Sequence, residues 1–164
     1  MFNTAISFVQ NNEWAEDIAQ DVFIEVYQSI EKFNEQSTLG TWIYRITVNK
    51  CLDQIRAQKR QKRFAFVTSL FHKDTGELIH DTSNFEHPGI LAEQKERAKY
   101  LFKTIERLPA SQKTAFILSQ IEGLSQKEIA EILNISTKAV ESLIQRAKTT
   151  LRTKLENIYE RRRK

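Results

Sequence analysis

A face of polar side chains near the C-terminal end of the sequence has the chemistry needed to read base pairs. Between residues 137 and 151 the apolar residues recur at helical spacing, so they must pack inward and turn polar residues to the opposite face. Amide, hydroxyl and carboxylate groups can bond base edges in the major groove, and basic side chains beside them can bind phosphates. The candidate DNA-contacting residues are Lys138, Glu141, Ser142, Gln145, Arg146 and Lys148.

Two short helices joined by a sharp corner are expected to position this face. Ser125 and Glu128 have the spacing of a capping box, which marks the start of the first helix. Asn134 tolerates the left-handed conformation that ends such a helix, Ser136 can cap the next one, and Ile135 between them is expected to face the core. An ordinary helical hairpin is the alternative, but cap, corner, core and basic flank together favour a DNA-binding helix-turn-helix.

The composition limits the classes of protein that fit. The chain has 164 residues, a net charge of +4 and only four glycines and two prolines, which predicts a soluble, all-α protein with a polyanionic partner. One cysteine, Cys51, excludes an intrachain disulfide, and a thiolate zinc site would need several more ligands. We expect no cofactor, no metal and no catalytic residue. With no membrane-span-length apolar run and no signal peptide, we expect a cytoplasmic protein.

The charges of the N-terminal half divide it into an acidic and a basic segment. Residues 13–35 carry seven acidic residues against one lysine, whereas residues 45–63 carry seven basic residues against one aspartate. Asp17, Asp21 and Glu25 fall at i, i+4 and i+8 of a helix and form an acidic stripe. Its apolar face is expected at Ile18, Val22, Phe23, Val26 and Ile30. The stripe weakens its own helix slightly, which a basic partner surface would explain, although a solvated acidic face is equally compatible.

The basic segment is predicted to be a helix that begins at Thr41, after a loop at residues 34–40. Its apolar positions are Trp42, Ile43, Ile46, Val48, Leu52 and Ile55, which leaves Arg45, Asn49, Lys50, Arg56 and Lys59 for the surface. Basic charge beside Trp42 and Tyr44 suits a single-stranded or melting DNA whose unstacked base the loop could hold. The alternative is that both aromatic rings are core residues, and for Trp42 alone this alternative is favoured.

Turn signals separate this half from a second helical domain. Residues 64–89 lack sustained helical periodicity and contain Asp74, Gly76 and the pair Pro88–Gly89, so we interpret them as an irregular linker. The predicted domains are therefore residues 1–63 and residues 90–164, the second with about four helices.

Three sequence blocks in order resemble the extracytoplasmic-function group of bacterial sigma factors. WAEDIAQDVFIEVY at residues 14–27 is similar to sigma region 2.2, and TWIYRITVNKCLDQIRAQKR at residues 41–60 is similar to regions 2.3 and 2.4. RLPASQKTAFILSQIEGLSQKEIAEIL at residues 107–133, followed by STKAVESLIQRAK, is similar to region 4. The resemblance covers nearly the whole chain and implies two small helical domains, sigma region 2 and sigma region 4.

The resemblance assigns a role to each surface. It implies that the chain binds core RNA polymerase and directs promoter-specific initiation, with region 2 on the clamp helices of the largest subunit and region 4 on the flap of the second largest. The polymerase contacts would be Asp17, Gln20, Asp21 and Glu25. The minus-ten element would be melted and held by Trp42, Arg45, Asn49, Lys50, Arg56 and Lys59. The recognition helix at residues 138–148 would read the minus-thirty-five element. An anti-sigma partner and association with the nucleoid are implied as well.

The sequence departs from the family pattern at several positions. The chain begins inside what would be region 2.1, so the helix that normally precedes residues 2–9 is missing, and a misplaced start or a shortened chain is the favoured explanation. Lys138 and Ala139 replace a frequent Gly-Thr pair, and Glu141 replaces a frequent basic residue. Glu141 can accept from cytosine N4, so the upstream element is expected to differ from the commonest one. Leu39 stands where an aromatic residue is frequent.

Two other classes of protein share some of these features. An autonomous repressor or activator would bind a palindromic operator as a dimer, but it would leave the acidic stripe and the Trp42 segment unexplained. A DNA-processing enzyme such as a recombinase would need a nucleophile or metal-binding carboxylates beside the DNA, and no such constellation is evident in the sequence.

Overall fold

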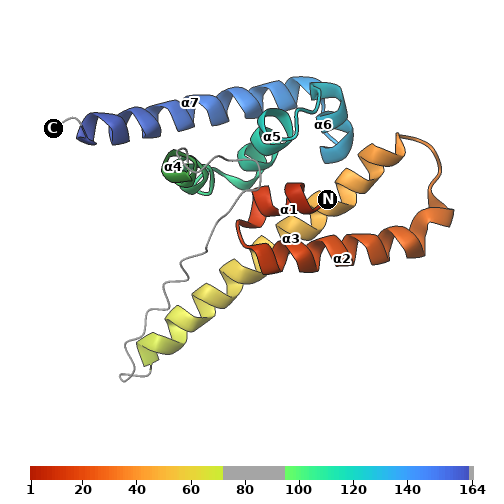
Figure 1. Cartoon of the computed structure of the whole chain (residues 1–164), viewed down its shortest axis with the longest axis horizontal. Helices are drawn as coiled ribbons and strands as arrows, with labels where there is room; N and C mark the ends of the chain where they lie inside the picture. Colours follow the sequence, from red (N-terminus) through yellow and green to blue (C-terminus); the bar gives the residue numbers. More distant parts are fainter. Residues whose placement is uncertain (72–94, 163–164) are drawn as a thin grey trace.

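The computed structural model describes residues 1–71 and 95–162 of the chain, and the regular structure within these ranges is entirely helical (Figure 1). The first range forms one helical half of the molecule and the second range forms the other. The predicted all-α fold with two helical domains is therefore confirmed. Within the described part, no helix is both long enough and apolar enough to span a bilayer.

The N-terminal half consists of α1 (Phe2–Val9), α2 (Asn12–Ser29), a 3-10 turn (Ile30–Lys32) and α3 (Leu39–Phe71). Gln10 ends α1 in the left-handed conformation, with φ of 54°. The Asn11 side chain then caps α2 by accepting from the Trp14 N–H at 2.9 Å. At the start of α3 the Thr38 hydroxyl accepts from the Thr41 N–H at 3.1 Å. These polar caps satisfy N–H groups that have no partner within the helix.

The core of this half is built around α1, which packs against both α2 and α3. Every residue of α1 from Thr4 to Val9 is buried. The two polar side chains among them are hydrogen-bonded, since the Thr4 hydroxyl donates to the Glu122 carboxylate and the Ser7 hydroxyl donates to the Asn3 carbonyl. Ile18 and Val22 of α2 and Ile46 and Val48 of α3 close the core around it.

The C-terminal half contains α4 (Lys95–Ile105), α5 (Ala110–Gln120), α6 (Gln126–Leu133) and α7 (Thr137–Arg162). The long α7 packs against α4, α5 and α6. Pro109 immediately precedes α5, where its fixed φ suits a helix start and its missing N–H costs nothing. This half has the four helices that the sequence predicted.

Three apolar residues expected in the core lie at the surface instead. Phe23 is 62% exposed, because successive residues of a helix are rotated by about 100° and this step places Phe23 beyond the buried side of α2 that Val22 occupies. Ile30 is 41% exposed, because it begins the 3-10 turn that follows α2. Ile135 is 37% exposed, because the corner itself is formed by backbone: its N–H donates to the Ala130 carbonyl at 3.1 Å. The prediction that these three side chains are buried was wrong.

Helix α3 also continues farther than the sequence suggested. It runs to Phe71, eight residues into the segment interpreted as the linker, and no glycine or proline interrupts it after Gly40. The remaining residues of that segment, 72–89, lie outside the described residues.

Candidate polymerase and nucleic-acid interfaces

The capping box predicted at the start of the helix-turn-helix is present on α6. The Ser125 hydroxyl accepts from the Glu128 N–H at 3.3 Å, while the Glu128 carboxylate accepts from the Ser125 N–H at 2.8 Å and from its hydroxyl at 2.7 Å. The hydrogen bonds from Ser125 lower the pKa of the Glu128 carboxyl. Asn134 ends α6 with φ of 53°, and Ser136 accepts from the Ala139 N–H at 3.2 Å to start α7. The predicted corner is confirmed.

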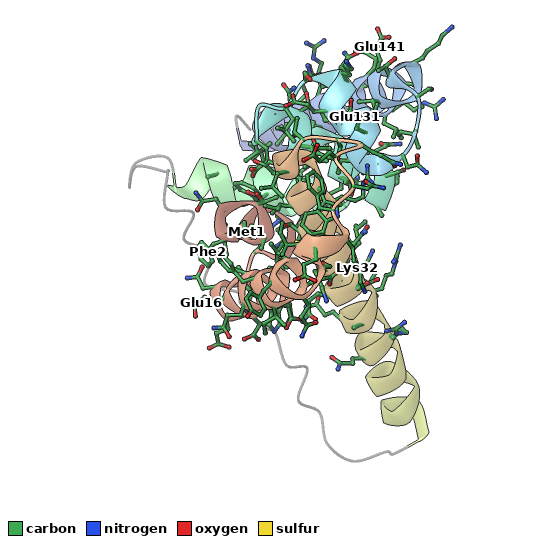
Figure 2. All side chains as sticks on the ribbon, turned by 90° about the vertical axis from the view of Figure 1, so that its right-hand side faces the viewer. Met1, Phe2, Glu16, Lys32, Glu131 and Glu141 are labelled. Atoms are coloured by element: carbon green, nitrogen blue, oxygen red, sulfur yellow. The ribbon has the colours of Figure 1, made fainter. Side chains whose placement is uncertain are left out.

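The exposed face of α7 is the one the sequence predicted. Val140, Ile144, Ala147 and Leu151 are buried against the rest of the C-terminal half. The six candidate DNA-contacting residues are all exposed: Lys138, Glu141, Ser142, Gln145, Arg146 and Lys148. Glu141 lies at the outer end of the molecule (Figure 2). This exposed polar face belongs to a single α-helix, and the major groove of DNA is wide enough to admit one.

The aromatic residues at the start of α3 are divided between two environments. Trp42 is partly buried and packs against Phe33, with ring centroids 5.3 Å apart and planes tilted by 41°. Its ring therefore packs beside the residue that precedes the loop at residues 34–40 and also against the core. That this loop holds an unstacked base stays a prediction. Tyr44 points elsewhere, since its hydroxyl donates to the Glu122 carboxylate at 3.1 Å.

The polar residues predicted to contact the minus-ten element differ in how available they are. Asn49, Arg56 and Lys59 are exposed on α3, with Arg56 donating to Asp53 of the preceding turn at 2.8 Å. Lys50 forms a salt bridge of 2.8 Å with Glu25 of α2, and this contact raises the pKa of the Lys50 ammonium. Arg45 is directed away from solvent and donates to the Glu131 carbonyl of α6 at 2.7 Å.

The acidic stripe lies on the outer side of α2. Asp17, Gln20 and Asp21 are exposed, and Glu25 is partly exposed beside Lys50. Apolar side chains are also exposed on this helix, with Phe23 62%, Ile24 55% and Tyr27 85% exposed. The helical periodicity of the sequence assigned Phe23 to the core, and it gave no prediction for Ile24 or Tyr27.

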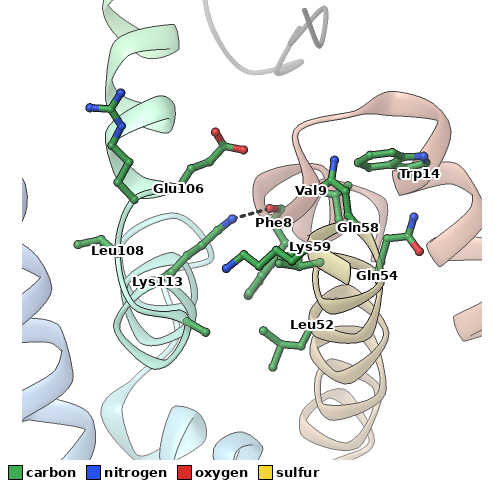
Figure 3. Close-up of a pocket in the computed structure, with 13 residues that line it drawn as sticks. Phe8, Val9, Trp14, Leu52, Gln54, Gln58, Lys59, Glu106, Leu108 and Lys113 are labelled. Atoms are coloured by element: carbon green, nitrogen blue, oxygen red, sulfur yellow. Dashed lines mark hydrogen bonds between the residues drawn. The ribbon is translucent and has the colours of Figure 1, made fainter. Parts of the chain in front are cut away.

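A pocket of about 330 Å³ lies where the two halves meet (Figure 3). Trp14 and Leu52 line one side and Lys113 of α5 the other. Lys113 is 8% exposed, and its ammonium donates to the Phe8 carbonyl at the end of α1 at 2.8 Å. Burial lowers the pKa of this ammonium. Within the described residues, no three side chains are grouped as a metal ion would require.

Comparisons with known proteins agree with this geometry. Residues 1–61 match the family Sigma-70 region 2, and residues 98–151 match the family Sigma-70, region 4. The chain is 35% identical over 142 residues to the ECF RNA polymerase sigma-E factor of Haemophilus influenzae, a match covering 85% of this chain and 74% of the relative. The chain is an ECF sigma factor. It is also 31% identical over 147 residues to the ECF RNA polymerase sigma-E factor of Escherichia coli, covering 88% and 75% of the two chains.

Two solved structures share the fold. The sigma factor RpoE of Bartonella quintana, solved in complex with the anti-sigma factor NepR, matches with a TM-score of 0.66 and 25% identity over 94% of this chain and 89% of that one. CnrH, solved in complex with the cytosolic domain of CnrY, matches in fold with a TM-score of 0.65. The family comprises transcription initiation factors of the sigma-70 type, so the surfaces on α2, α3 and α7 belong to sigma regions 2 and 4.

Proposed function

We propose that this chain binds core RNA polymerase and directs it to promoters that have separate minus-ten and minus-thirty-five elements. The supporting observation is that one chain carries three distinct exposed surfaces: the acidic stripe of α2, the basic face of α3 and the recognition face of α7. In Figure 2 Glu141 of α7 lies at the upper end of the molecule, and Glu16 of α2 lies well below it, on the other half. An operator-binding regulator needs only the last of these surfaces.

The surface on α2 is the proposed docking site for the clamp helices of the largest polymerase subunit. Asp17, Gln20 and Asp21 offer carboxylates and an amide to basic groups of the polymerase, with Glu25 at the edge of the surface. The exposed rings of Phe23 and Tyr27 lie on the same side of α2 as Gln20 and add apolar area there. Aromatic side chains are enriched in protein interfaces.

The face of α3 is the proposed binding site for the minus-ten element. Asn49, Lys50, Arg56 and Lys59 follow one another along α3, and Trp42 borders the loop that would receive an extruded base. Binding the extruded base would offset the few kcal/mol of unstacking and make strand opening depend on sequence. Residues 1–63 would thus form the melting domain, and residues 90–164 the domain that reads the minus-thirty-five element through α7.

The C-terminal half also offers a site for the flap of the second largest subunit. An open groove of about 450 Å³ runs between α4, α5 and α7, and its apolar floor includes Leu101, Phe116 and Leu151. A short apolar helix of a partner fits such a groove. We further propose an anti-sigma partner, a cytoplasmic, nucleoid-associated location, and no chemical reaction catalysed by this chain itself.

Transcription of genomic DNA by purified core polymerase tests the proposed function. Sequencing of the transcripts made with and without the protein should reveal new 5′ ends that share a two-part upstream motif. A variant with Glu141 replaced by alanine should lose the upstream half of that motif, whereas the Glu156→Ala variant, which removes another exposed carboxylate of α7, should retain it. No change in the transcripts on adding the protein would overturn the proposal.

A further inference from the structure

The pocket shown in Figure 3 is large enough for a small molecule. Its volume of about 330 Å³ lies within the range of about 300–1,000 Å³ that is typical of ligand sites in proteins. Trp14 of α2 and Leu52 and Ile55 of α3 are partly buried side chains that line it. The pocket therefore offers apolar walls to a ligand, one of them an aromatic ring.

The charged residues that line the pocket are mainly basic. Three basic side chains line it, those of Lys59, Arg107 and Lys113. Among the described residues of the lining, Glu106 is the only acidic one. The side chains of Lys59 and Lys113 extend from α3 and α5, and their ammonium groups point toward the same part of the pocket (Figure 3). A concave surface with this balance of charge attracts an anion.

Lys113 carries a buried charge without a counter-charge in contact. Its side chain is 8% exposed, and its ammonium donates one hydrogen bond, to the Phe8 carbonyl at 2.8 Å. Among the side chains that the structure describes, no carboxylate lies within salt-bridge distance of this ammonium. An ammonium has three N–H donors, so two remain for other acceptors. A buried cation is costly unless it is paired, and an anion in the pocket would therefore be stabilised by Lys113.

The electrostatics of Lys113 agree with this geometry. Burial is the main cause that lowers the pKa of its ammonium, the carboxylate of Glu106 opposes that shift, and the positive charge of Lys59 adds to it. The ammonium groups of Lys59 and Lys113 therefore repel each other. An anion bound between them would replace this repulsion by two attractions.

We infer that this pocket binds a small organic anion that has one carboxylate and an apolar body. Lys113 and Lys59 bind the carboxylate, and the apolar body packs against Trp14 and Leu52 on the opposite wall. A monocarboxylate fits this lining better than a nucleotide or a sugar phosphate, because the ammonium groups converge at one place only and the opposite wall is largely apolar. This binding site is an addition to the proposed contacts with polymerase and promoter.

Titration of the full chain with octanoate, followed by NMR, tests the inference. The chain has two tryptophans, so the ¹⁵N-labelled protein gives two indole N–H signals, which the spectrum of a Trp42→Phe variant assigns. The Trp14 signal should shift saturably with octanoate, because Trp14 lines the pocket. The Trp42 signal should not shift, because Trp42 does not line it.

Two further compounds show which parts of the ligand are needed. Octan-1-ol, which lacks the charge, should bind about tenfold more weakly than octanoate, because a hydrogen bond to a charged group is lost. Acetate, which lacks the apolar body, should bind more than about 100-fold more weakly, because each buried CH₂ group increases affinity about fourfold.

The variant Lys113→Met removes the buried ammonium and keeps an unbranched side chain in its place. It should bind octanoate at least about tenfold more weakly than the wild type. Lys127→Met is the matched control, because it removes the same charge at an exposed position of α6 outside the pocket, and it should bind octanoate as the wild type does. Lys59→Met alters an exposed position and decides the matter if Lys113→Met does not fold, with an expected loss of about twofold to fivefold.

Three results would each overturn the inference: no saturable shift of the Trp14 signal, equal affinity for octanoate and octan-1-ol, or an unchanged affinity for octanoate in the folded variants of Lys113 and Lys59. Lys59 is also a proposed contact of the minus-ten element, but neither DNA nor polymerase is present in these measurements. Their failure would therefore leave the proposed function intact, and failure of the transcription experiment would leave the octanoate titrations unaffected.

Discussion

Replacing Asp21 by lysine should weaken the binding of core polymerase strongly while leaving the chain folded. Asp21 is exposed in the middle of the acidic stripe, with Asp17 and Glu25 one turn away on either side. Each like-charge pair at this spacing destabilises a helix by about 0.2–0.5 kcal/mol, so reversing Asp21 turns two repulsions into attractions worth about 0.8–2 kcal/mol together. Asp21 also helps to raise the pKa of Lys50, so the new lysine repels Lys50, which offsets up to about 1 kcal/mol.

The free energy of unfolding of this variant should therefore be unchanged or higher, by up to about 2 kcal/mol, in urea denaturation. Binding should change in the opposite direction, because a positive charge then faces basic groups of the polymerase. A loss of at least about 2 kcal/mol, or about 30-fold in Kd, is expected when the polymerase is titrated with labelled protein at low salt.

Glu156→Lys is the matched control, since Glu156 is exposed on α7 rather than on α2. It changes the net charge by the same amount and should bind the polymerase within a few-fold of the wild type. Equal losses in the two variants would mean that only overall charge matters. Unchanged binding of the Asp21→Lys variant would reduce the stripe to a solvated face and refute the docking proposal for α2.

Three further predictions concern single residues. Arg146→Ala should weaken the binding of the polymerase complex to minus-thirty-five duplexes of any sequence. Filter binding at several salt concentrations should show that the slope of log affinity against log salt concentration is reduced by about 0.9. An unchanged slope would exclude a phosphate contact. Ser125→Ala should lower the free energy of unfolding by about 0.5–2 kcal/mol at neutral pH. That difference should shrink as the pH falls through the pKa of Glu128, which is lowered to below about 4.5, because a protonated carboxyl is a poorer hydrogen-bond acceptor. A difference in unfolding free energy that does not depend on pH would contradict the capping box. Cys51 is buried, and burial raises its pKa to about 12, whereas the thiol of an unfolded chain has an ordinary pKa of about 8.5. At pH 8 the native chain should therefore react with a thiol reagent roughly 10³-fold more slowly than the urea-unfolded chain. Comparable rates would show that the core around Cys51 is open.

The local signals of the sequence were the most reliable ones. The capping box of Ser125 and Glu128 and the left-handed Asn134 were predictable because each depends on residues within one turn. The burial of Val140 and Ala147 followed from helical periodicity alone. The same periodicity misplaced Phe23, because a partner surface keeps apolar side chains exposed and a single sequence does not distinguish them from core residues.

The contacts between the two halves were beyond the sequence signals. Tyr44 and Arg45 are separated from Glu122 and Glu131 by 78 and 86 residues, and no local pattern relates the members of such pairs. Lys113 belongs to a helix whose other polar residues gave no reason to expect a buried ammonium. These residues are polar groups that satisfy one another across an interface, and their pairing depends on how two separately formed domains meet.

A gel-shift experiment on a single promoter fragment tests the central claim most directly. The fragment is one identified in the genomic transcription experiment, and it is incubated with the protein alone, with core polymerase alone, and with both. A sequence-specific complex should form only when both are present, and in that complex the thymines of the minus-ten element should become reactive to permanganate. A specific complex with the protein alone that polymerase neither strengthens nor opens would instead identify an autonomous regulator.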